Sequence, residues 1–512
     1  MTYTSLLRLA LFVFAMYANV VYARFLFNPL HAQNIFLYVL ALIADTLTLL
    51  ILSYTWISCL YFEIFKAKYY SEITYLQDKG QFLLKKKTAV LIPVVNESLT
   101  LIRKTLNAAL KMEGVKNVYL LDDGRRKELE LLAYDLGINY LRRNDRSYNK
   151  AGNINHALTV VDEDFVAVFD ADFIPNVNFL KETLPLFSDM TIGIVQTPQI
   201  YYNENNFFSK GFKNFQSIFY NYIMPSKSLQ NSAICVGTNV VYRKSSLDLI
   251  GGVPRLQHSE DINTSLKMYE KGIRTFYLNK NLAEGLSPDN VISFFNQQFR
   301  WSKGGFTMLF RNNTLFNRKL TWDQRLQFFF SNLFYLTGIT IFIYLITPLL
   351  AIIFNSSAIN PDFFFEWVSS YALFFTANFI FYSLLVRKNI LQTIALGIFC
   401  YIPYTKAING ALFNRGFNWK TTNANSSDIV TKLIAPFFPY IITSIAVLYL
   451  FVIGFLAFEA TLILYAFWIA VNTLIILYLI INCYLSVLIK HKVKSSEEVK
   501  SFTIPSMMIQ TT

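Results

Sequence analysis

Residues 165–172 read Phe-Val-Ala-Val-Phe-Asp-Ala-Asp, a short apolar run that ends in two carboxylates. A continuous apolar run of this length is typical of a strand that is buried on both faces of a sheet. Similar runs precede it at Ala89–Val95 and Val118–Leu121, and helical patterns lie between them at Leu99–Met112 and Lys127–Leu136. This alternation predicts an α/β domain with a mainly parallel sheet.

The rest of the chain is much more apolar than a soluble protein. Of the 512 residues, 54% are hydrophobic and only 15% are charged, whereas about a quarter of the residues of a soluble domain are charged. A helix that crosses a membrane needs roughly 20 apolar residues. The predicted spans lie at about 5–22, 35–62, 328–353, 364–386, 433–455 and 461–488.

Two apolar segments have alternative interpretations. The first run is also compatible with a signal peptide, but it lacks a clear small-residue cleavage site and a second span follows closely. The segment 390–413 is apolar but is interrupted by Pro403, Lys406 and Asn409. Such a pattern favours an interfacial helix over a membrane crossing.

These runs divide the chain into four expected parts: N-terminal transmembrane helices (1–62), a cytosolic domain with interfacial helices (63–325), a C-terminal transmembrane region (326–489) and a cytosolic tail (490–512). Basic residues follow three of the spans, and the loop 355–362 has none. This distribution predicts that both termini and the α/β domain lie on the cytoplasmic side of the plasma (inner) membrane. The basic residues are Lys66, Lys68, Arg387, Lys388, Lys490, Lys492 and Lys494.

Charge and cysteine content exclude other classes of protein. The formal net charge is +13, but no basic run alternates with aromatic residues as in a nucleic-acid groove. Basic residues beside membrane segments explain the charge better. The four cysteines, Cys59, Cys235, Cys400 and Cys483, have an irregular spacing that fits neither a disulfide framework nor a zinc site.

Acidic residues follow two of the predicted strands, where ligands bind in an open α/β sheet. Asp122 and Asp123 precede Gly124, so they can hold a metal or accept hydrogen bonds from a base or ribose, or simply form a turn. Asp170 and Asp172 are spaced to grip one divalent cation such as Mg²⁺ or Mn²⁺, although a polar turn is again the alternative.

Three further segments carry candidate chemistry. Ser259-Glu260-Asp261 opens the helical pattern Ile262–Lys271, either as a helix cap or with Asp261 as a general base. Gln297, Arg300 and Trp301 share one helix face, on which Arg can clamp phosphate and Trp can stack on a ring; a membrane-interface belt is the alternative. Residues 149–153 form a short loop whose lysine can reach a phosphate.

Taken in order, these residues resemble the processive family-2 glycosyltransferases, specifically the cellulose synthase group, from about Ala89 to Phe310. The resemblance implies a GT-A (Rossmann-like) cytosolic domain inserted between transmembrane helices. The matching segments are Ile92-Pro93 with Asn96-Glu97, Asp122-Asp123-Gly124, Lys150-Ala151-Gly152-Asn153, Asp170-Ala171-Asp172, Gln196-Thr197-Pro198, Ser259-Glu260-Asp261 and Gln297 with Arg300-Trp301.

The sequence also departs from this family. In Ile234–Thr238 the cysteine is displaced by one residue from the family's Phe-Cys-Gly-Thr/Ser, and Gln199 stands where bacterial members tend to have His. Residues 417–422 only loosely resemble the gating-loop motif, and the chain ends soon after its last span, without room for a cyclic-di-GMP-binding domain. These departures bear on acceptor geometry, linkage and regulation.

The resemblance assigns a role to each motif residue. The donor nucleotide is expected at Glu97, Asp122, Asp123, Lys150, Asp170, Gln297 and Arg300. Asp170 and Asp172 are expected to hold Mg²⁺ or Mn²⁺. Asp261 is the expected base, with Glu260 and Arg300 also catalytic. The acceptor is expected at Trp301, Gln196, Thr197, Pro198 and Cys235.

The implied activity is that of an inverting hexosyltransferase that builds a β-linked polysaccharide, foremost a cellulose-like β-1,4-glucan from UDP-glucose, and moves it across the membrane. The expected partners are the UDP-sugar, the growing polymer, the lipid bilayer and accessory secretion subunits, with no nucleic acid. The alternatives are a synthase of mixed-linkage glucan, mannan, or a hyaluronan- or chitin-like polymer, a non-processive glycolipid transferase, and an inactive transport scaffold.

Overall fold

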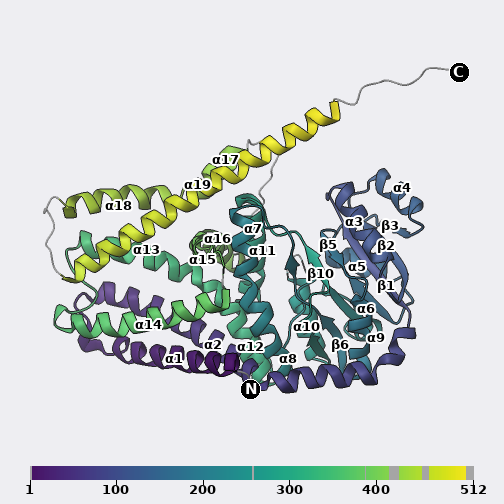
Figure 1. Cartoon of the computed structure of the whole chain (residues 1–512), viewed down its shortest axis with the longest axis horizontal. Coiled ribbons are helices and arrows are strands. Elements are labelled where there is room, and N and C mark those ends of the chain that lie inside the picture. Colours follow the sequence, from purple (N-terminus) through teal and green to yellow (C-terminus); the bar gives the residue numbers. More distant parts are fainter. Residues whose placement is uncertain (1–2, 257–258, 387, 414–425, 453–459, 503–512) are drawn as a thin grey trace.

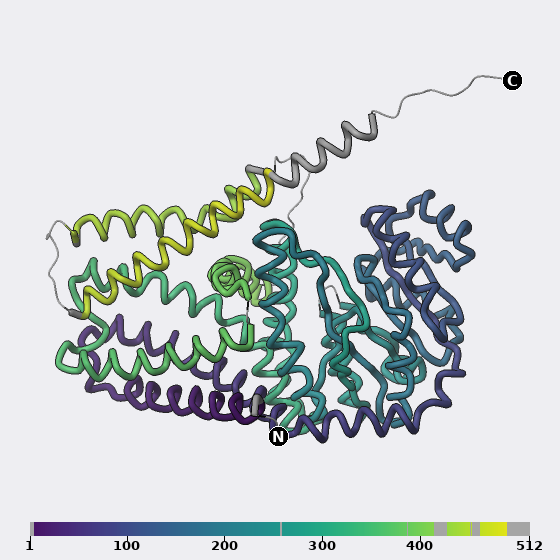
Figure 2. Tube along the Cα trace, in the orientation of Figure 1, coloured from purple at the N-terminus to yellow at the C-terminus, as the bar shows by residue number. Residues whose placement is uncertain are grey.

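The chain forms a bundle of long helices beside an α/β domain (Figure 1). This computed structural model describes residues 3–256, 259–386, 388–413, 426–452 and 460–502. Figure 2 shows that helices from both ends of the chain lie together in the bundle. Helix α1 (Tyr3–Leu26), for example, packs along α14 (Phe364–Val386).

The domain is built on a seven-stranded sheet in the order β3-β2-β1-β4-β8-β6-β9. Adjacent strands are parallel except where β8 runs antiparallel to β4 and β6, so the predicted mainly parallel sheet is confirmed. The strands are β1 (Thr88–Val94), β2 (Val115–Asp122), β3 (Asn139–Leu141), β4 (Phe165–Val168), β6 (Ile192–Gln196), β8 (Val240–Arg243) and β9 (Arg274–Tyr277).

The domain also contains a second sheet of three short strands. Its order is β5-β10-β7, with β10 antiparallel to β5 and parallel to β7. The strands are β5 (Phe173–Pro175), β7 (Ile200–Tyr201) and β10 (Ala283–Gly285). Because β5 begins directly after Asp172, this small sheet fixes the direction in which the chain leaves the second acidic motif.

Both faces of the large sheet are buried because its strands alternate between two apolar clusters. Val90 and Ile92 of β1 join one cluster, and Leu91 joins the other. Fully burying each such side chain stabilises the fold by about 1.5–3 kcal/mol. The helices of the domain are α3 (Leu99–Leu110), α4 (Lys127–Asp135), α5 (Asn149–Leu158), α6 (Phe179–Thr183), α8 (Met224–Leu229), α9 (Lys244–Leu249) and α10 (Glu260–Tyr269).

Among the described residues, five helical segments are long and apolar enough to cross a membrane, or six if one bent pair counts as a span. The bent pair is α17 (Ser426–Ile434) with α18 (Phe437–Val452), which meet at an angle of 54°. Pro436 lies in the break, where it cannot supply a backbone N–H to continue the helix. The five segments are Ser5–Leu26, Ile35–Lys79, Trp322–Ile353, Pro361–Val386 and Thr461–Leu488.

Helix α2 (Ile35–Lys79) continues well past the predicted end of its span at residue 62. Its second half packs on the domain, where Tyr69, Ile73 and Leu76 are buried in the same apolar cluster as β1. This second half carries charged residues on its outer face, so its sequence is typical of a helix in a soluble domain. The apolar pattern of the span therefore ends at about residue 62, although the helix continues without a break to Lys79.

Four helices lie between the bundle and the domain: α7 (Phe207–Phe215), α11 (Val291–Phe310), α15 (Ile390–Phe399) and α16 (Tyr401–Leu412). Helix α11 packs on α16, and α7 packs on α15. The segment 390–413, which was predicted to form one interfacial helix, forms two short helices, α15 and α16, that meet at Cys400. Helices α12 (Trp322–Leu333), α13 (Thr337–Ile353) and α19 (Ala460–Phe502) complete the bundle. Arg387 and residues 417–422 lie outside the described residues.

Candidate active site

Asp122 ends β2 and is fully buried. Its Oδ1 accepts hydrogen bonds from the backbone N–H groups of Gly124 (2.7 Å) and Arg125 (3.1 Å). Its Oδ2 accepts from the backbone N–H of Arg126 (2.7 Å) and from the hydroxyl of Tyr140 (2.9 Å). Asp122 therefore shapes the turn at the carboxyl end of β2, and its direct contact with a nucleoside stays a prediction.

Asp123 is held by Arg143, a residue that the sequence did not single out. The guanidinium donates from Nε to Oδ1 at 2.7 Å and from Nη2 to Oδ2 at 2.6 Å, and both side chains are buried. Any contact of Asp123 with a nucleotide stays a prediction. In the sequence, Arg143 lies within a charged stretch that reads as a solvated loop, so only its three-dimensional partner reveals its role.

Arg143 also fixes the loop that begins α5. Its Nη1 donates to the carbonyl oxygen of Ser147 at 2.7 Å, and its Nη2 donates to that of Asn149 at 2.8 Å. Between these carbonyls, Tyr148 and Asn149 have positive φ angles of 63° and 44°, a conformation that costs free energy in non-glycine residues. A Cβ on Gly152 would lie 2.3 Å from Nη1 of Arg143. Glycine is therefore required at this position, because the guanidinium lies directly against the first turn of α5.

The segment 149–153, predicted as a short loop, is instead the start of helix α5. Lys150, in its first turn, connects two loops of the site. Its ammonium group forms an ion pair with the Asp170 carboxylate and donates to the Gly237 carbonyl oxygen at 2.8 Å. Burial is the largest single influence and lowers the pKa of Lys150, but the carboxylates of Asp170, Glu260 and Asp261 together raise it above its usual value. The Asp170 backbone N–H donates to the Thr238 hydroxyl at 2.9 Å. The second acidic motif and the loop at Gly237 are thus joined at two points.

The chemistry of Asp170 and Asp172 fits a divalent cation. Burial raises the pKa of Asp172 to about 7, with a further contribution from the negative charge of Asp170. Two carboxylates this close repel each other, so a shared cation would stabilise both. Among the described residues, no set of three or more Asp, Glu, His and Cys side chains gathers around one point. Mg²⁺ is commonly held by one or two carboxylates together with substrate phosphates, which matches this pair.

Asp261 lies in the first turn of α10 and faces the Gly237 loop. Its Oδ2 is 3.1 Å from the position that a Cβ on Gly237 would occupy, and its Oδ1 accepts from the Ile262 backbone N–H at 2.8 Å. Burial, with a further contribution from the negative charge of Glu260, raises the pKa of Asp261 to about 7. A carboxylate with such a pKa can exchange a proton near neutral pH, as a general base requires.

Ser259 stands at the N-cap position of α10, with Glu260 and Asp261 in the first turn, so the helix-cap interpretation is confirmed for the position but not for a side-chain hydrogen bond. Ser259 has a positive φ of 56°, and its side chain makes no capping hydrogen bond. Its Oγ instead lies 1.5 Å from the position that a Cβ on Gly304 of α11 would occupy. Glycine at position 304 therefore lets α11 approach the loop that carries Asp261.

The residues predicted to line the acceptor site are mostly buried. Gln196 is fully buried; its Nε2 donates to the Thr238 carbonyl oxygen at 2.8 Å, and its Oε1 accepts from the Val236 N–H at 2.9 Å. The Thr197 hydroxyl donates to the Asn239 carbonyl oxygen at 3.0 Å, and the Pro198 carbonyl oxygen accepts from the Asn239 side-chain amide at 3.2 Å. These residues hold the loop 236–239 in place, and their direct contact with an acceptor stays a prediction.

Cys235 and Gln199, two points of departure from the family pattern, both contact the loop 236–239; the Cys235 Sγ accepts from the Gly237 backbone N–H at 3.4 Å. Cys235 is fully buried, and its Sγ lies 3.0 Å from the Tyr242 hydroxyl. Burial raises the pKa of the Cys235 thiol to about 12, so it is uncharged at neutral pH. Gln199 donates to the Val236 carbonyl oxygen at 3.3 Å and accepts from the Tyr201 hydroxyl at 2.8 Å.

Helix α11 presents its predicted residues in different environments. Trp301 is half-buried, with its ring centroid 6.0 Å from that of Phe212. Gln297 has a buried side-chain oxygen without a hydrogen-bond partner among the described residues. Arg300 is exposed, and no hydrogen bond or ion pair is found for it in the described part of the chain. Gly304 lies about one turn after Trp301, where the helix approaches Ser259 closely.

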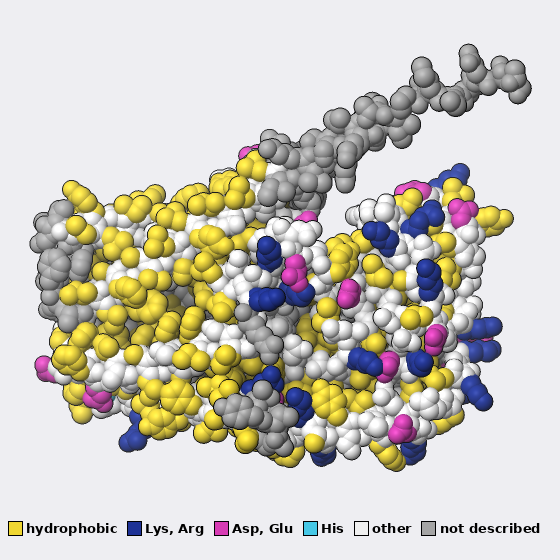
Figure 3. Space-filling view, viewed as in Figure 1, with side chains coloured by type: hydrophobic (Ala, Val, Ile, Leu, Met, Phe, Trp, Pro, Cys, Tyr) yellow, Lys and Arg dark blue, Asp and Glu magenta, His cyan; other side chains and the backbone are white. Residues whose placement is uncertain are grey.

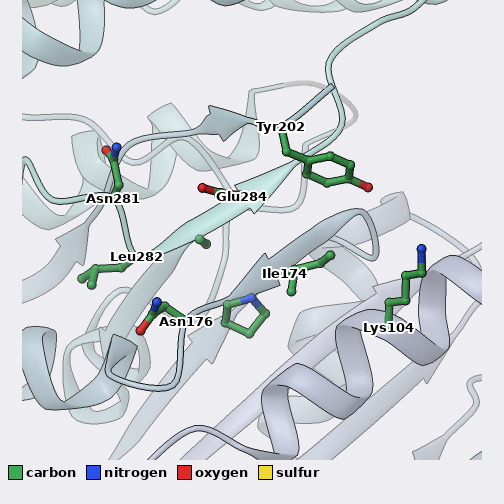
Figure 4. A pocket seen from close by; sticks show the side chains of 9 residues that line it. Lys104, Ile174, Asn176, Tyr202, Asn281, Leu282 and Glu284 are labelled. Atoms are coloured by element: carbon green, nitrogen blue, oxygen red, sulfur yellow. The ribbon is translucent and has the colours of Figure 1, made fainter. Parts of the chain in front are cut away.

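A cavity of about 440 Å³ lies on the outer face of the small sheet, lined by Ile174, Tyr202, Glu284 and Lys104 among others (Figure 4). None of the motif residues lines it. The candidate site is therefore defined by the joined loops of Lys150, Asp170 and Asp261 rather than by this cavity.

Two family models match adjoining parts of the chain. Residues 89–251 match the model described as "Glycosyl transferase family 2". Residues 249–392 match the model described as "Cellulose synthase". Together the matched residues cover every motif described above.

Similar proteins were also found among curated sequences and solved structures. The UDP-forming cellulose synthase catalytic subunit of Pseudomonas fluorescens (strain SBW25) is 33% identical over 53% of this chain and 38% of its own length. Cellulose synthase 2 of Novacetimonas hansenii is 33% identical over 51% of this chain and 17% of its own length. The chain thus spans less than half the length of these relatives. A mannosyltransferase from Pyrobaculum calidifontis, in complex with GDP-Man and Mn²⁺, covers 69% of this chain and 98% of its own at 15% identity and a TM-score of 0.47.

Proposed function

Because the chain belongs, through residues 89–392, to the family-2 glycosyltransferases of the cellulose synthase group, we propose that it polymerises a β-linked polysaccharide from a UDP-sugar. The leading product is a cellulose-like β-1,4-glucan made from UDP-glucose. The α/β domain has the GT-A fold of this family. The observation that carries the proposal is the link from Lys150 to both Asp170 and the Gly237 loop, against which Asp261 lies.

The donor side is formed by the loops after β1, β2 and β4. Glu97, Asp123 and the turn built by Asp122 are proposed to bind the nucleoside. The Arg126 guanidinium supports this arrangement, because its Nη1 donates to the Glu97 carbonyl oxygen at 2.6 Å. Asp170 and Asp172 are proposed to hold a Mg²⁺ or Mn²⁺ ion, which supplies positive charge for the leaving diphosphate.

The chemical step proposed for Asp261 is removal of a proton. Its carboxylate accepts the proton of the acceptor hydroxyl while that oxygen attacks the anomeric carbon of the donor sugar. The bond from this carbon to the diphosphate oxygen breaks, and UDP leaves with the electron pair. One in-line displacement inverts the anomeric centre, so an α-linked donor gives a β-linked product. Lys150 and the exposed Arg300 add positive charge on the side of the leaving group.

The acceptor side is proposed at α11, where Trp301 offers an aromatic face for the terminal sugar of the polymer. Gln297 is proposed to bind the donor on the same helix face, because its side-chain oxygen is buried without a partner in the described residues. The contact between Gly304 and Ser259 supports this assignment, because it holds the helix against the loop of the base.

The chain is a membrane protein, and its parts are proposed to be arranged as two spans (1–62), a cytoplasmic domain with interfacial helices (63–325), a channel region (326–489) and a cytoplasmic tail (490–512). Both termini would then be cytoplasmic, and the polymer would leave through the helix bundle. The basic residues that flank the spans support this orientation in the plasma membrane.

A product assay tests the proposal. The purified chain, reconstituted in lipid with Mg²⁺ or Mn²⁺, receives one radiolabelled UDP-sugar at a time, and any polymer is digested with linkage-specific hydrolases. Label from UDP-glucose in a polymer that β-1,4-glucanase degrades is the expected result. Incorporation of another sugar, or resistance of the polymer to that hydrolase, would show that the product is a different polysaccharide. UDP release without polymer would indicate a non-processive transferase. Absence of UDP release with every donor would refute the enzymatic proposal.

A further inference from the structure

Three lysines surround one glutamate where the α/β domain meets the helix bundle. Lys210 and Lys213 lie on α7, and Lys388 follows the end of α14. Lys213 forms an ion pair with Glu204. This hydrogen bond lowers the pKa of Glu204, and the charges of Lys388 and Lys210 act in the same direction. The side-chain amide of Asn214 donates to the carbonyl oxygens of both Lys210 (3.4 Å) and Lys388 (2.7 Å), so the backbones that carry these two lysines lie side by side. We call the three lysines and Glu204 the basic junction.

The basic junction is tied to the end of a predicted membrane span. The side chain of Asn214 on α7 donates from Nδ2 to the Lys388 carbonyl oxygen at 2.7 Å. On its other face α7 is apolar, and Phe207 packs on Tyr478 of α19 with ring centroids 5.4 Å apart. The lysines therefore lie close to the level at which α14 ends.

The surface of the chain changes character at the same level. Figure 3 shows a nearly continuous hydrophobic surface over the bundle, and Lys, Arg, Asp and Glu side chains gather where this surface gives way to the domain. The side chains of Lys210, Lys213 and Lys388 all reach the surface.

Three positive charges around one negative charge leave an excess of positive charge that the described residues do not balance. Lys213 forms its ion pair with Glu204, and no ion pair is found for Lys210 or Lys388 in the described part of the chain. An anion beside this group would be attracted to all three ammonium groups. A phosphate that is anchored in the membrane would reach them from the side on which the bundle is apolar.

We propose that the basic junction binds the phosphate of an anionic lipid headgroup at the cytoplasmic end of α14. The proposal rests on the membrane placement given under the proposed function. A nucleic acid fits the site less well, because the exposed aromatic residues needed for base stacking do not alternate with these lysines. A lipid bound here would contact α7 and the end of α14 at once, and would hold the domain at a fixed height on the membrane.

Lipid retention tests the proposal without any sugar donor. The full chain is placed in nanodiscs of phosphatidylcholine with phosphatidylglycerol, and the lipids that stay bound are counted by native mass spectrometry. We expect wild type to retain phosphatidylglycerol in preference to phosphatidylcholine. The triple variant K210Q/K213Q/K388Q should lose this preference, with affinity falling roughly fivefold for each lysine removed.

A matched variant, K104Q/K116Q/K127Q, removes the same charge from exposed positions in the domain and should retain phosphatidylglycerol like wild type. Glu204→Gln should strengthen retention, which a merely unfolded protein would not show. Lys388→Gln alone serves where the triple variant does not fold, and should weaken retention roughly fivefold.

Three results would overturn the proposal. Equal retention by wild type and the triple variant would show that other residues hold the lipid. Loss of retention on addition of inorganic phosphate would indicate a site for free phosphate. Equal retention of phosphatidylcholine and phosphatidylglycerol would show that the negative charge of the lipid does not determine binding. The lipid assay contains no sugar donor, so its result does not depend on catalysis. A chain that retains the lipid in this assay but makes no polymer in the product assay would contradict only the proposed function.

Discussion

Arg143 donates two hydrogen bonds to Asp123, at 2.7 Å and 2.6 Å, and in the same position donates to the carbonyl oxygens of Ser147 and Asn149. One guanidinium thus connects the turn after β2 with the start of α5, the helix that carries Lys150. A planar group with five N–H donors is needed for this, and a lysine cannot replace it.

The first prediction concerns this pair. Arg143→Lys should weaken UDP binding by at least about tenfold and lower the free energy of unfolding by roughly 3–5 kcal/mol, because a buried carboxylate loses its bidentate partner. Calorimetric titration with UDP and denaturant unfolding measure the two effects. The neighbouring exposed residue Arg142 supplies the control, since Arg142→Lys keeps the same chemistry without a buried partner. Equal UDP affinity in the two variants would show that Arg143 has no positioning role.

The second prediction identifies the base. Asp261→Asn should reduce polymer synthesis by more than about 10³-fold, because the amide cannot accept the proton, while the dissociation constant of UDP changes less than about threefold. Radiolabel incorporation and UDP titration on the same preparation measure both quantities. Asp248→Asn, at an exposed site on α9, is the control. Synthesis at a normal rate by purified Asp261→Asn would assign the base elsewhere.

The third prediction is a pH dependence. Burial and the charge of Glu260 raise the pKa of Asp261 to about 7, so the carboxylate becomes protonated, and inactive as a base, as the pH falls through that value. Initial rates should therefore drop about tenfold per pH unit well below pH 7 and level off above it. Glu260→Gln removes a negative neighbour, lowers the pKa of Asp261 and should shift the acidic limb to lower pH. An unchanged limb in this variant would mean that another group controls it.

The fourth prediction separates acceptor from donor. Trp301→Ala should shorten the polymer and lower the rate of elongation by about 10- to 100-fold, because the terminal sugar loses its aromatic platform. UDP affinity should stay nearly constant. Trp301→Phe should restore most of the elongation, and Trp322→Ala, at an exposed position, should behave like wild type. A parallel loss of UDP affinity would place Trp301 on the donor side.

The sequence was sufficient to predict those elements that have apolar surroundings on every side. Strands β1, β2 and β4 are buried on both faces, and the spans are apolar along their length, so each leaves an uninterrupted apolar run. The strands of the small sheet have only two or three residues, which is too short for any pattern. The continuation of α2 was hidden by the charges on its outer face.

The site was predictable as a set of motifs but not as a set of contacts. Asp122 and Gln196 stand in recognisable motifs, yet they are fully buried and bind backbone groups of neighbouring loops. Arg143 lies 20 residues from Asp123 in the chain, and neither residue type nor spacing distinguishes it from its exposed neighbour Arg142. Such pairings depend on the path of the loops, which local patterns do not encode.

Helix α2 has 45 residues, about 68 Å at the rise of an α-helix, and it is buried at one end against the bundle and at the other against the domain. An α-helix turns about 100° per residue. The number of residues in α2 therefore sets both the distance and the rotation between its two buried faces. One residue inserted near its middle would rotate Tyr69 and Leu76 by that angle relative to Leu37 and Leu49, and both contact faces could not be kept. An insertion of seven residues, nearly two full turns, would preserve the faces but raise the domain by about 10 Å. The height and the angle of the catalytic domain over the bundle are therefore encoded together in the length of one helix.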